Sequence, residues 1–297
     1  MKLIPNPDLK KMTTLRVGGR GLVEVVLTCD KDFDLLPSVI EKEGGIPYTI
    51  GKGSNILPDE GIIPVVLIRV DFENKIEFLY ENENDIILRA GASVPLARLI
   101  RFCMKNGLSG IESFAGIPGT VGGAVAMNAG AFGREIKDVI RRVTLWGERS
   151  GFMNFYKESL CFGYRTFSPK VYDEYWCVLN VDFCLKKDFP IRIKDRVRKT
   201  YFKKKSSQPI LNHTCGCVFK NPSCDVSAGY LLDKCGLKGF RIGDMSFSEK
   251  HANFLINLGK GTAKEAWELI DIARERVKTE MDIDLELEVK PLRKNMV

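Results

Sequence analysis

Short runs of β-branched and aromatic residues alternate along the chain with segments whose apolar residues recur at helical spacing. Because Gly, Asn and Asp bound these runs, we predict strands over residues 22–28, 46–50, 62–70, 76–80, 86–90, 139–146 and 176–185. The helical spacing predicts helices over residues 31–43 and 95–106, and Gly107 follows the second as a C-cap. Strands and helices therefore interleave along the chain.

Towards the C-terminal end, Thr262 and Glu265 form the capping box of a helix that we expect to run to about residue 279. The sequence then alternates, which predicts a strand over residues 283–289. The pattern does not decide whether the acidic side chains of this strand are only solvated or have a function. The two faces would carry Ile283, Leu285, Leu287 and Val289 towards the core and Asp284, Glu286 and Glu288 on the other side.

A change of composition marks the middle of the chain. Residues 191–205 hold eight Lys and Arg against one acid, Asp195, and supply much of the formal net charge of +7. We expect a solvated helix face, with steering of a phosphorylated small molecule as the next alternative. Nucleic-acid binding would need a recognised motif, which the sequence lacks. We place a domain boundary at Phe189 and Pro190, giving domains of residues 1–189 and 190–297.

The composition is that of a globular protein, with 297 residues, 44% of them hydrophobic and 28% charged. No apolar run reaches the roughly 18 residues of a membrane helix. Residues 1–11 offer no signal peptide, so we expect a cytoplasmic protein without a membrane partner. In a reducing compartment we expect six of its nine cysteines to be small buried hydrophobic residues: Cys29, Cys103, Cys161, Cys177, Cys184 and Cys235.

The most unusual segment is the run over residues 115–133, which has six glycines, five alanines and no charged side chain. Glycine allows positive φ angles and close approach of the backbone to another group, so the run suggests a large flat ligand. Tight packing of elements without a ligand is the main alternative. A flexible linker is disfavoured because apolar residues are spaced through the run.

Phosphate-binding motifs of the common kinds are absent from the sequence, since neither the P-loop nor the Gly-x-Gly-x-x-Gly pattern fits. What remains is the turn over residues 51–55, at the end of a predicted strand. Its bare backbone amides would form an anion-binding nest, to which Ser54 and Asn55 add side-chain donors.

A second candidate site surrounds Gly216. His213, Cys215, Cys217 and Cys224 are four possible zinc ligands, although their spacing is not that of a zinc knuckle. Alternatively, Gly216 turns the backbone so that one thiol faces a pocket and donates a proton. A packed turn with inert thiols is the third possibility.

Eight blocks, in order, resemble the UDP-N-acetylenolpyruvoylglucosamine reductase family, and the match covers nearly the whole chain. They include Thr13-Thr14-Leu15-Arg16-Val17-Gly18-Gly19, residues 51–55 with Asp59 and Gly61, and the run over 115–133. The others are Phe162-Gly163-Tyr164-Arg165, residues 216–222, Leu232-Asp233 with Gly236-Leu237-Lys238-Gly239, Lys250-His251-Ala252-Asn253-Phe254 and Leu285-Glu286-Leu287-Glu288-Val289-Lys290. In length the chain is similar to the shorter class of the family.

The resemblance implies an α+β fold: an FAD-binding module of the vanillyl-alcohol-oxidase (PCMH) type in two subdomains, divided near residue 70, and a smaller α+β substrate-binding domain. The last strand would return to the active site. FAD would bind noncovalently, its pyrophosphate on the turn and its flavin along the glycine run. The implied cofactor-binding residues are Gly51, Lys52, Gly53, Ser54, Asn55, Ala115, Gly116, Pro118, Gly119, Gly122, Gly123, Ala124 and Asn128.

The resemblance also implies the reaction, in which NADPH reduces FAD and leaves before the enolpyruvyl substrate enters the same pocket. Arg165 would bind and polarise the substrate carboxylate, Glu288 would act with it to stabilise the enolate, and Cys217 would deliver a proton to C2. Tyr164, Lys220, Asn221 and His251 match substrate-binding positions. No metal or nucleic acid is implied, and we expect a monomer with small-molecule partners.

Three positions depart from the family pattern. Cys217 stands where serine is most frequent, Phe167 precedes Ser168 where serine is common, and Lys52 replaces a glycine. A thiol at position 217 can still donate a proton, and neither of the other two changes removes an implied catalytic group. Two other functions stay open: a different FAD-dependent oxidase or dehydrogenase of the same fold, and a non-enzymatic module that binds metal or nucleic acid through the Cys/His cluster and the basic helix.

Overall fold

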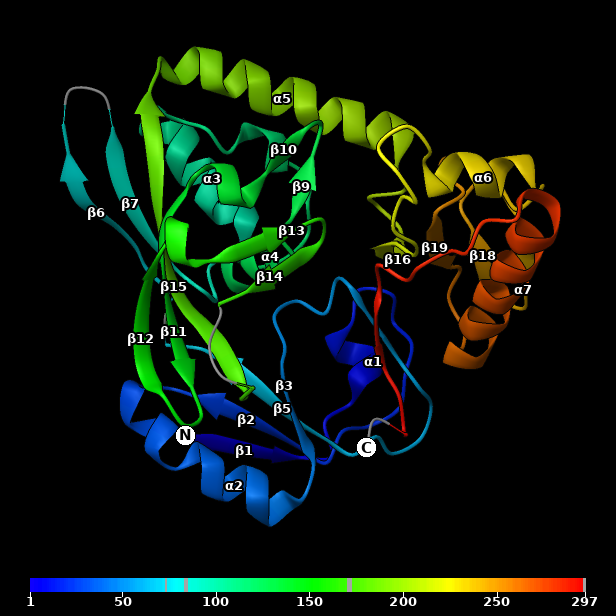
Figure 1. The fold of residues 1–297 in the computed structure, drawn as a ribbon, viewed down its shortest axis with the longest axis horizontal. Coiled ribbons are helices and arrows are strands. Elements are labelled where there is room, and N and C mark those ends of the chain that lie inside the picture. Colours follow the sequence, from blue (N-terminus) through cyan, green and yellow to red (C-terminus); the bar gives the residue numbers. More distant parts are fainter. Residues whose placement is uncertain (73, 83–84, 170–172, 296–297) are drawn as a thin grey trace.

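The computed structural model describes residues 1–72, 74–82, 85–169 and 173–295. Its N-terminal residues form a four-stranded sheet in the order β1-β2-β5-β3, in which only β1 is antiparallel to its neighbour (Figure 1). Strands β2 and β5 are almost entirely buried, as expected for parallel strands covered on both faces. The elements are β1 (Lys2–Pro5), α1 (Leu9–Met12), β2 (Val23–Leu27), the 3₁₀ helix η1 (Asp30–Asp34), α2 (Leu36–Glu43), β3 (Ile46–Thr49) and β5 (Val65–Val70).

A second, antiparallel sheet follows, with the strand order β12-β11-β15-β7-β6 and with β8 paired to the end of β15. Its longest strand, β15, forms the centre. The two sheets share a core, because Trp146 and Leu179 of the second sheet pack with Val25 and Phe33 of the first part. The strands are β6 (Ile76–Glu81), β7 (Ile86–Gly91), β8 (Leu108–Ser109), β11 (Ile140–Gly147), β12 (Gly151–Tyr156) and β15 (Trp176–Lys187).

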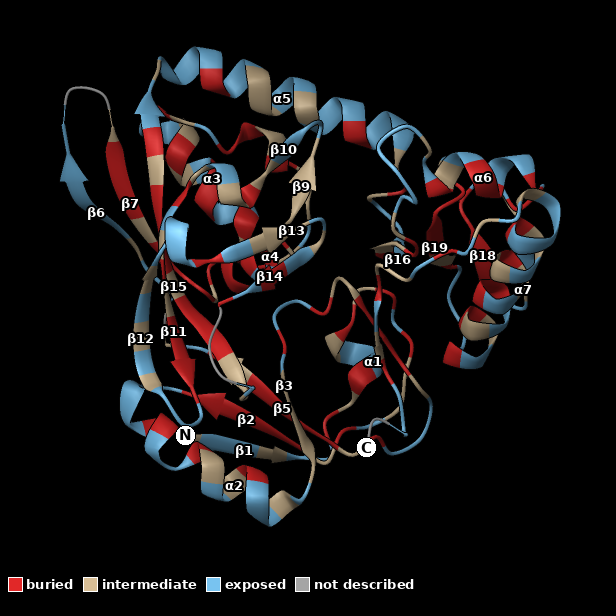
Figure 2. Ribbon diagram, viewed as in Figure 1, coloured by how far each residue is buried: buried red, intermediate tan, exposed pale blue. Residues whose placement is uncertain are grey.

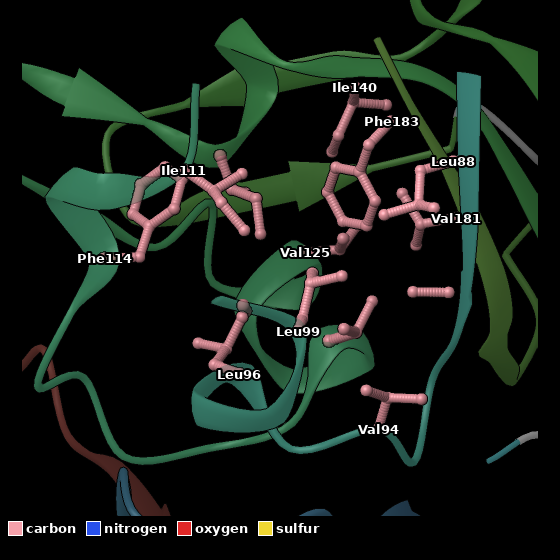
Figure 3. Packing of buried hydrophobic residues seen from close by; sticks show 14 of the residues in the cluster. Leu88, Val94, Leu96, Leu99, Ile111, Phe114, Val125, Ile140, Val181 and Phe183 are labelled. Atoms are coloured by element: carbon pink, nitrogen blue, oxygen red, sulfur yellow. The ribbon is translucent and has the colours of Figure 1, made fainter. Parts of the chain in front are cut away.

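Helices α3 (Leu96–Lys105) and α4 (Val121–Ala126) cover one face of this sheet. The buried residues of α3 recur at helical spacing, and Gly107 follows the helix with a φ of +68°, as predicted. Figure 3 shows side chains of α3 and α4 pointing towards those of β7, β11 and β15, which places the main core between the helices and the sheet. The short elements beside them are η2 (Glu112–Phe114), β9 (Gly130–Ala131), β10 (Arg134–Glu135), η3 (Ile136–Asp138), η4 (Lys157–Ser159), β13 (Cys161–Gly163) and β14 (Thr166–Ser168).

The helix α5 (Pro190–Ser207) crosses from this sheet to the C-terminal part of the molecule (Figure 1). Most of α5 is exposed in Figure 2, as predicted for its basic sequence. The C-terminal part contains a four-stranded antiparallel sheet in the order β16-β19-β18-β17 and two helices packed on it. Its elements are β16 (His213–Cys217), α6 (Ala228–Lys234), β17 (Arg241–Ile242), β18 (Met245–Phe247), β19 (Phe254–Asn257) and α7 (Ala263–Met281).

The end of the described chain returns to the N-terminal part. Strand β20 (Lys290–Leu292) pairs in parallel with β4 (Ile56–Pro58), which directly follows the turn over residues 51–55. The backbone amide of Lys290 donates to the carbonyl of Asn55 at 3.0 Å. The segment before β20 therefore lies beside the turn.

Several sequence predictions need correction. Residues 283–289 form no regular strand: only Leu287 makes an isolated bridge, to Phe219, although Leu285 and Val289 are buried as the alternation required. The predicted helix over 31–43 is divided into η1 and α2, with Pro37 in the first turn of α2. The strand predicted from residue 62 begins at Val65, because Pro64 lacks a backbone N–H.

The cysteine prediction is partly wrong. Cys103, Cys177 and Cys235 are buried, whereas Cys184 is half-buried. Cys29 and Cys161 are exposed, because each lies at the edge of its element, outside the cores. The capping box of α7 is confirmed, since Thr262 and Glu265 exchange hydrogen bonds with each other's backbone amides. None of the described helices is both long enough and apolar enough to cross a membrane.

Candidate active site

A cavity of about 1210 Å³ lies between the C-terminal part of the molecule and the two sheets that precede it in the chain. It is bounded by the turn over 51–55, the glycine run, α5, β16 and the segment that precedes β20. Fifteen of the sequence-predicted site residues line it: Gly51, Lys52, Gly53, Ser54, Asn55, Ala115, Gly116, Pro118, Gly119, Gly122, Gly123, Ala124, Arg165, Cys217 and Glu288. The fold thus brings the predicted cofactor and catalytic residues into one space.

The turn over residues 51–55 presents its backbone to this cavity. Within the described ranges, none of its five backbone amides donates a hydrogen bond to another residue of the chain. Two hydrogen bonds fix the turn to the rest of the chain. Ser54 Oγ donates to the Pro118 carbonyl at 3.0 Å, and the Thr14 amide donates to the Gly53 carbonyl at 3.1 Å. Five consecutive free amides on a fixed turn are suited to binding an anion such as a pyrophosphate.

The glycine run serves both packing and the cavity. A Cβ atom at Gly122 would lie 2.9 Å from the Cβ of Ala92, so this glycine is required by the contact between α4 and the sheet. At Gly123 and Gly119 the nearest atoms would be single hydroxyl oxygens at 3.5 and 3.6 Å, which leaves the backbone open to the cavity. The ligand and packing interpretations of the run therefore apply to different glycines.

Asn128 is the one predicted cofactor residue that does not line the cavity. It is fully buried with a φ of +38°, and its side-chain amide donates to Glu135 at 3.0 Å and to the Gly163 carbonyl at 2.9 Å. Asn128 thereby connects the end of the glycine run to the hairpin that carries Arg165.

Arg165 and Glu288 form an ion pair on the cavity wall, with Arg165 Nε donating to Glu288 Oε1 at 2.8 Å. Arg165 occupies the two-residue turn between β13 and β14 with a φ of +57°, a conformation that is uncommon for residues other than glycine. Burial raises the pKa of the Glu288 carboxyl, and the charge of Arg165 offsets only part of this effect. Burial lowers the pKa of Arg165, but Glu288 outweighs it and the net shift is upward.

Cys217 lies at the end of β16, after a bulge in the pairing of β16 with β19. Gly216 has a φ of +82°, which turns the strand as predicted, and its amide donates to Thr214 Oγ1 at 3.2 Å. Burial raises the pKa of the Cys217 thiol well above its usual range; Glu288 adds to the shift and Arg165 opposes it. Burial likewise raises the pKa of Cys215, to about 12. Both thiols are therefore neutral near pH 7.

Metal ligands are not gathered at this site. Among the described residues, no group of three or more His, Cys, Asp or Glu side chains is arranged to hold a metal ion. Cys224 is exposed, and its thiol contacts the carboxylate of the neighbouring Asp225.

The four predicted substrate-binding residues lie outside the cavity lining. Tyr164 neighbours Arg165, whose guanidinium stands 5.0 Å from the ring, and its hydroxyl accepts from the Asn221 amide at 3.5 Å. Lys220 pairs with the exposed Glu286. Asn221 also accepts from the amide of Ala228 at the start of α6, and His251 packs against Phe254 with its pKa lowered by burial.

Sequence reasoning missed the part of the lining that comes from α5, namely Val197, Tyr201 and Lys204, with Gln208 just beyond the helix. Their spacing of four, three and four residues is the period of a helix face and was the available signal. The surrounding lysines and arginines obscured it. Tyr48 and Tyr175, which also line the cavity, carried no recognisable pattern.

The residues present fit FAD. The cavity exceeds the common range of about 300–1,000 Å³ for ligand sites and is therefore large enough for a dinucleotide. The free amides over residues 51–55 suit its pyrophosphate, and the open backbone at Gly119 and Gly123 suits the approach of a flat ring.

Comparison with known proteins gives two matching family models. Residues 40–151 match the model described as an FAD binding domain, and residues 208–292 match the C-terminal domain of UDP-N-acetylenolpyruvoylglucosamine reductase. The UDP-N-acetylenolpyruvoylglucosamine reductase of Nitratidesulfovibrio vulgaris is 44% identical over 98% of this chain and 99% of its own length. That of Oleidesulfovibrio alaskensis is 40% identical over 97% of both chains.

Among solved structures, the crystal structure of UDP-N-acetylenolpyruvylglucosamine reductase from Thermus caldophilus matches with a TM-score of 0.78. The two chains are 32% identical in sequence, and the match covers 98% of each. The similarity thus extends over the whole of both folds.

Proposed function

Since this chain belongs to the UDP-N-acetylenolpyruvoylglucosamine reductase family, we propose that NADPH is the electron donor with which it forms UDP-N-acetylmuramate from UDP-N-acetylglucosamine enolpyruvate. The chain is an FAD-dependent oxidoreductase, and its reaction belongs to the synthesis of peptidoglycan precursors. The matches also confirm the predicted fold class, an FAD-binding module of the vanillyl-alcohol-oxidase type with a smaller α+β domain.

The observation that carries the proposed chemistry is the Arg165–Glu288 pair beside a neutral thiol on one cavity wall. FAD, when bound, supplies the two-electron transfer. As the enolpyruvyl group is reduced, negative charge builds on its C2 carbon and carboxylate. Arg165 is a fixed cation held in place by Glu288 and by the Gly130 carbonyl, so it stabilises that charge without having to reorganise.

Glu288 has two roles in this proposal. Its carboxylate orients the guanidinium of Arg165 through the 2.8 Å hydrogen bond. Because burial raises its pKa, its carboxyl group also accepts a proton more readily than an exposed glutamate, which favours stabilisation of an enolate rather than repulsion of it. Glu286, on the same side of the segment, is exposed and paired with Lys220.

Cys217 is proposed to deliver the proton to C2. Its thiol lines the cavity and remains protonated near neutral pH, since its pKa is raised by burial. A thiol donates only one proton, so the deprotonated Cys217 must be reprotonated before the next turnover. The left-handed backbone at Gly216 turns the chain just before Cys217, the last residue of β16.

We expect Arg165→Ala and Glu288→Gln to impair the substrate half-reaction far more than the reduction of FAD by NADPH. Both groups act on charge that appears only on the enolpyruvyl substrate. Stopped-flow absorbance at the flavin band measures the two half-reactions separately. We expect reoxidation by the enolpyruvyl substrate to slow by at least about 100-fold, as for loss of an oxyanion-stabilising donor. Equal losses in both half-reactions contradict the assignment.

The purified protein should be yellow and should react slowly with oxygen once reduced. Fast reoxidation by oxygen, with no reoxidation by the enolpyruvyl substrate, would instead identify another flavin oxidase of the same fold. A protein that stays colourless after reconstitution with FAD contradicts the proposal.

Its partners are proposed to be small molecules, the UDP-sugar and NADPH, and the protein a cytoplasmic monomer that binds no nucleic acid. Light scattering on the holoenzyme tests whether it is a monomer. A mobility-shift assay with duplex DNA tests whether the basic face of α5 binds nucleic acid.

A further inference from the structure

Three residues of α5 and the one that follows it face the cavity: Val197, Tyr201, Lys204 and Gln208. The helix is otherwise a basic, exposed element, and the proposed chemistry leaves this face without a role. Lys204 is its only charged member.

Lys204 differs from the lysines around it. Its side chain is 2% exposed, whereas Lys203 and Lys205 are both exposed. Lys204 Nζ donates to the Ser113 carbonyl at 3.3 Å and lies 5.7 Å from the ring centre of Phe132. Among the described residues, none of the ion pairs includes Lys204. The ammonium group is thus buried with a single polar contact.

The electrostatic surroundings oppose this charge further. The pKa of Lys204 is lowered to about 8, mainly by burial and further by the positive charge of Arg165. At neutral pH the group is still mostly protonated, so two cations act on the same region of the cavity. Glu288, the acid paired with Arg165, does not pair with Lys204.

A structural role does not explain the charge. The aliphatic part of Lys204 packs on the glycine run, because a Cβ at Gly116 would lie 3.4 Å from Lys204 Cδ. An uncharged side chain would make that contact equally well. The helix is instead fastened by Arg196, which pairs with Glu112 at 2.8 Å and with Asp188 at 2.6 Å.

We propose that Lys204 is a substrate-binding residue whose ammonium group binds an anionic oxygen group of the substrate, its carboxylate or its diphosphate, beside Arg165. This inference rests on the proposed function. A buried cation without an acidic partner is stabilised when a ligand brings a negative charge to it. We assign the pyrophosphate of FAD to the free amides over residues 51–55, so that group does not need Lys204.

The test compares Lys204→Gln, Lys204→Arg and the control Lys205→Gln, all as FAD-loaded holoenzymes. Lys205 is the exposed neighbour and has the same charge. Titration calorimetry on the oxidised enzymes measures Kd for UDP and for the enolpyruvyl substrate. Loss of a charge-assisted hydrogen bond, about 1.5–3 kcal/mol, corresponds to an increase of about 10- to 100-fold in Kd for Lys204→Gln. Lys204→Arg should retain much of the affinity, and Lys205→Gln should resemble the wild type.

The two ligands identify the group that is bound. A weaker Kd for both supports contact with the diphosphate, and a weaker Kd for the enolpyruvyl substrate alone supports contact with the carboxylate. Unchanged Kd values for both overturn the inference, as does a loss shared equally by Lys205→Gln. The melting temperature of Lys204→Gln should not fall, since the substitution removes a buried unpaired charge; a large fall would show a structural role and also overturn it.

Failure of the inference and failure of the proposed function give different results. If the wild-type enzyme turns over and Lys204→Gln binds normally, only the inference fails. If the wild-type holoenzyme neither binds nor reduces the enolpyruvyl substrate, the proposed function fails.

Discussion

At the scale of single residues, burial determines which of two similar groups is suited to chemistry. Glu286 and Glu288 lie two residues apart, and the alternating pattern cannot distinguish them. In the structure Glu286 is 73% exposed and Glu288 only 13%. The raised pKa of Glu288 follows from that difference. Burial likewise distinguishes Lys204 from its exposed neighbours Lys203 and Lys205 in α5.

Replacement of Cys217 separates proton delivery from reduction of FAD. We expect Cys217→Ala to be reduced by NADPH at a nearly normal rate and to lose about 10²- to 10⁴-fold in turnover, the typical effect of losing a general acid. Cys217→Ser should retain substantial activity, because a hydroxyl can also donate.

The matched control for this change is Cys215→Ala, since Cys215 is a buried thiol on the same strand. We expect it to be nearly normal in both half-reactions by stopped flow. If Cys217→Ala also turns over normally, another group delivers the proton.

As the pH rises, deprotonation of Lys204 should affect the kinetics at a lower pH than deprotonation of Cys217. As the pH rises through about 8, Lys204 loses its charge, so kcat/KM for the enolpyruvyl substrate should fall. Cys217 stays protonated over the same range because its pKa is raised, so kcat should stay level. The titratable and charged groups near Lys204 are Arg165, Tyr201 and Lys203, whose ammonium group lies 4.6 Å from the ring centre of Phe132.

Steady-state kinetics from pH 6 to 10 measure both parameters. In Lys204→Arg the fall of kcat/KM near pH 8 should disappear, because arginine keeps its charge throughout. A fall of kcat with an ordinary thiol pKa near 8.5 would contradict the burial of Cys217.

At the scale of elements, two glycines with the same backbone conformation differ in how much space surrounds them. Gly53 and Gly44 have φ angles of +58° and +66°. A Cβ at Gly53 would lie 2.2 Å from the Met12 carbonyl oxygen, whereas at Gly44 it would meet nothing within 4 Å. The turn over residues 51–55 is therefore fixed by contact with the C-terminal end of α1 as well as by its own φ angles.

We expect Gly53→Ala to lower FAD occupancy severalfold, because the side chain forces the free amides of the turn out of position. Gly44→Ala is the control: it carries the same cost of a left-handed alanine, about 1–2 kcal/mol, without the collision. The ratio of flavin to protein absorbance measures occupancy. Equal occupancy in both variants would show that the turn is not part of the cofactor site.

The sequence predicted most of the longer elements but not the conformation of the segment that carries Glu288. Strands such as β7 and β15 and helices such as α3 are long or strongly periodic, so local pattern and tertiary structure agree. Residues 283–289 alternate equally clearly, yet they face no partner strand and bond to Val218 and Lys220 of an irregular stretch instead. Pairing partners are not encoded in a local pattern.

At the scale of the whole molecule, charge and ligand chemistry agree. The chain has a formal net charge of +7, while NADPH and the UDP-sugar are both polyanions. A positive field raises the association rate of anionic ligands and is screened by salt, with a Debye length of about 10 Å at 0.1 M and about 3 Å at 1 M.

We therefore expect kcat/KM for both substrates to fall severalfold between low salt and 0.5 M NaCl, as judged from the steep loss of steering with ionic strength. The value of kcat should change little, because salt screens charges inside the cavity less than charges on the surface. If kcat/KM does not depend on salt, the basic residues of α5 do not speed the association of the substrates.

The overall organisation was predictable mainly from the resemblance, since residues 51–55, 115–133 and 216–222 are compact sequence blocks. The domain limits near residue 70 and at 189–190 stay predictions. Pocket residues from α5 were missed because a lysine at position 204 looks the same in the sequence as those at 203 and 205. Only the packing of α5 against η2 and the glycine run shows which of them is buried.

The pairing of β20 with β4 has a consequence for biosynthesis. Asn55 binds the carbonyl of Glu288 through its side chain at 3.1 Å and receives the amide of Lys290, although these residues are more than two hundred positions apart. The cofactor turn leaves the ribosome early, but the strand that supports it and the glutamate that faces it are translated much later. A nascent chain therefore has no complete active site until translation has passed Leu292, and a premature stop before Glu288 removes the strand and the glutamate together.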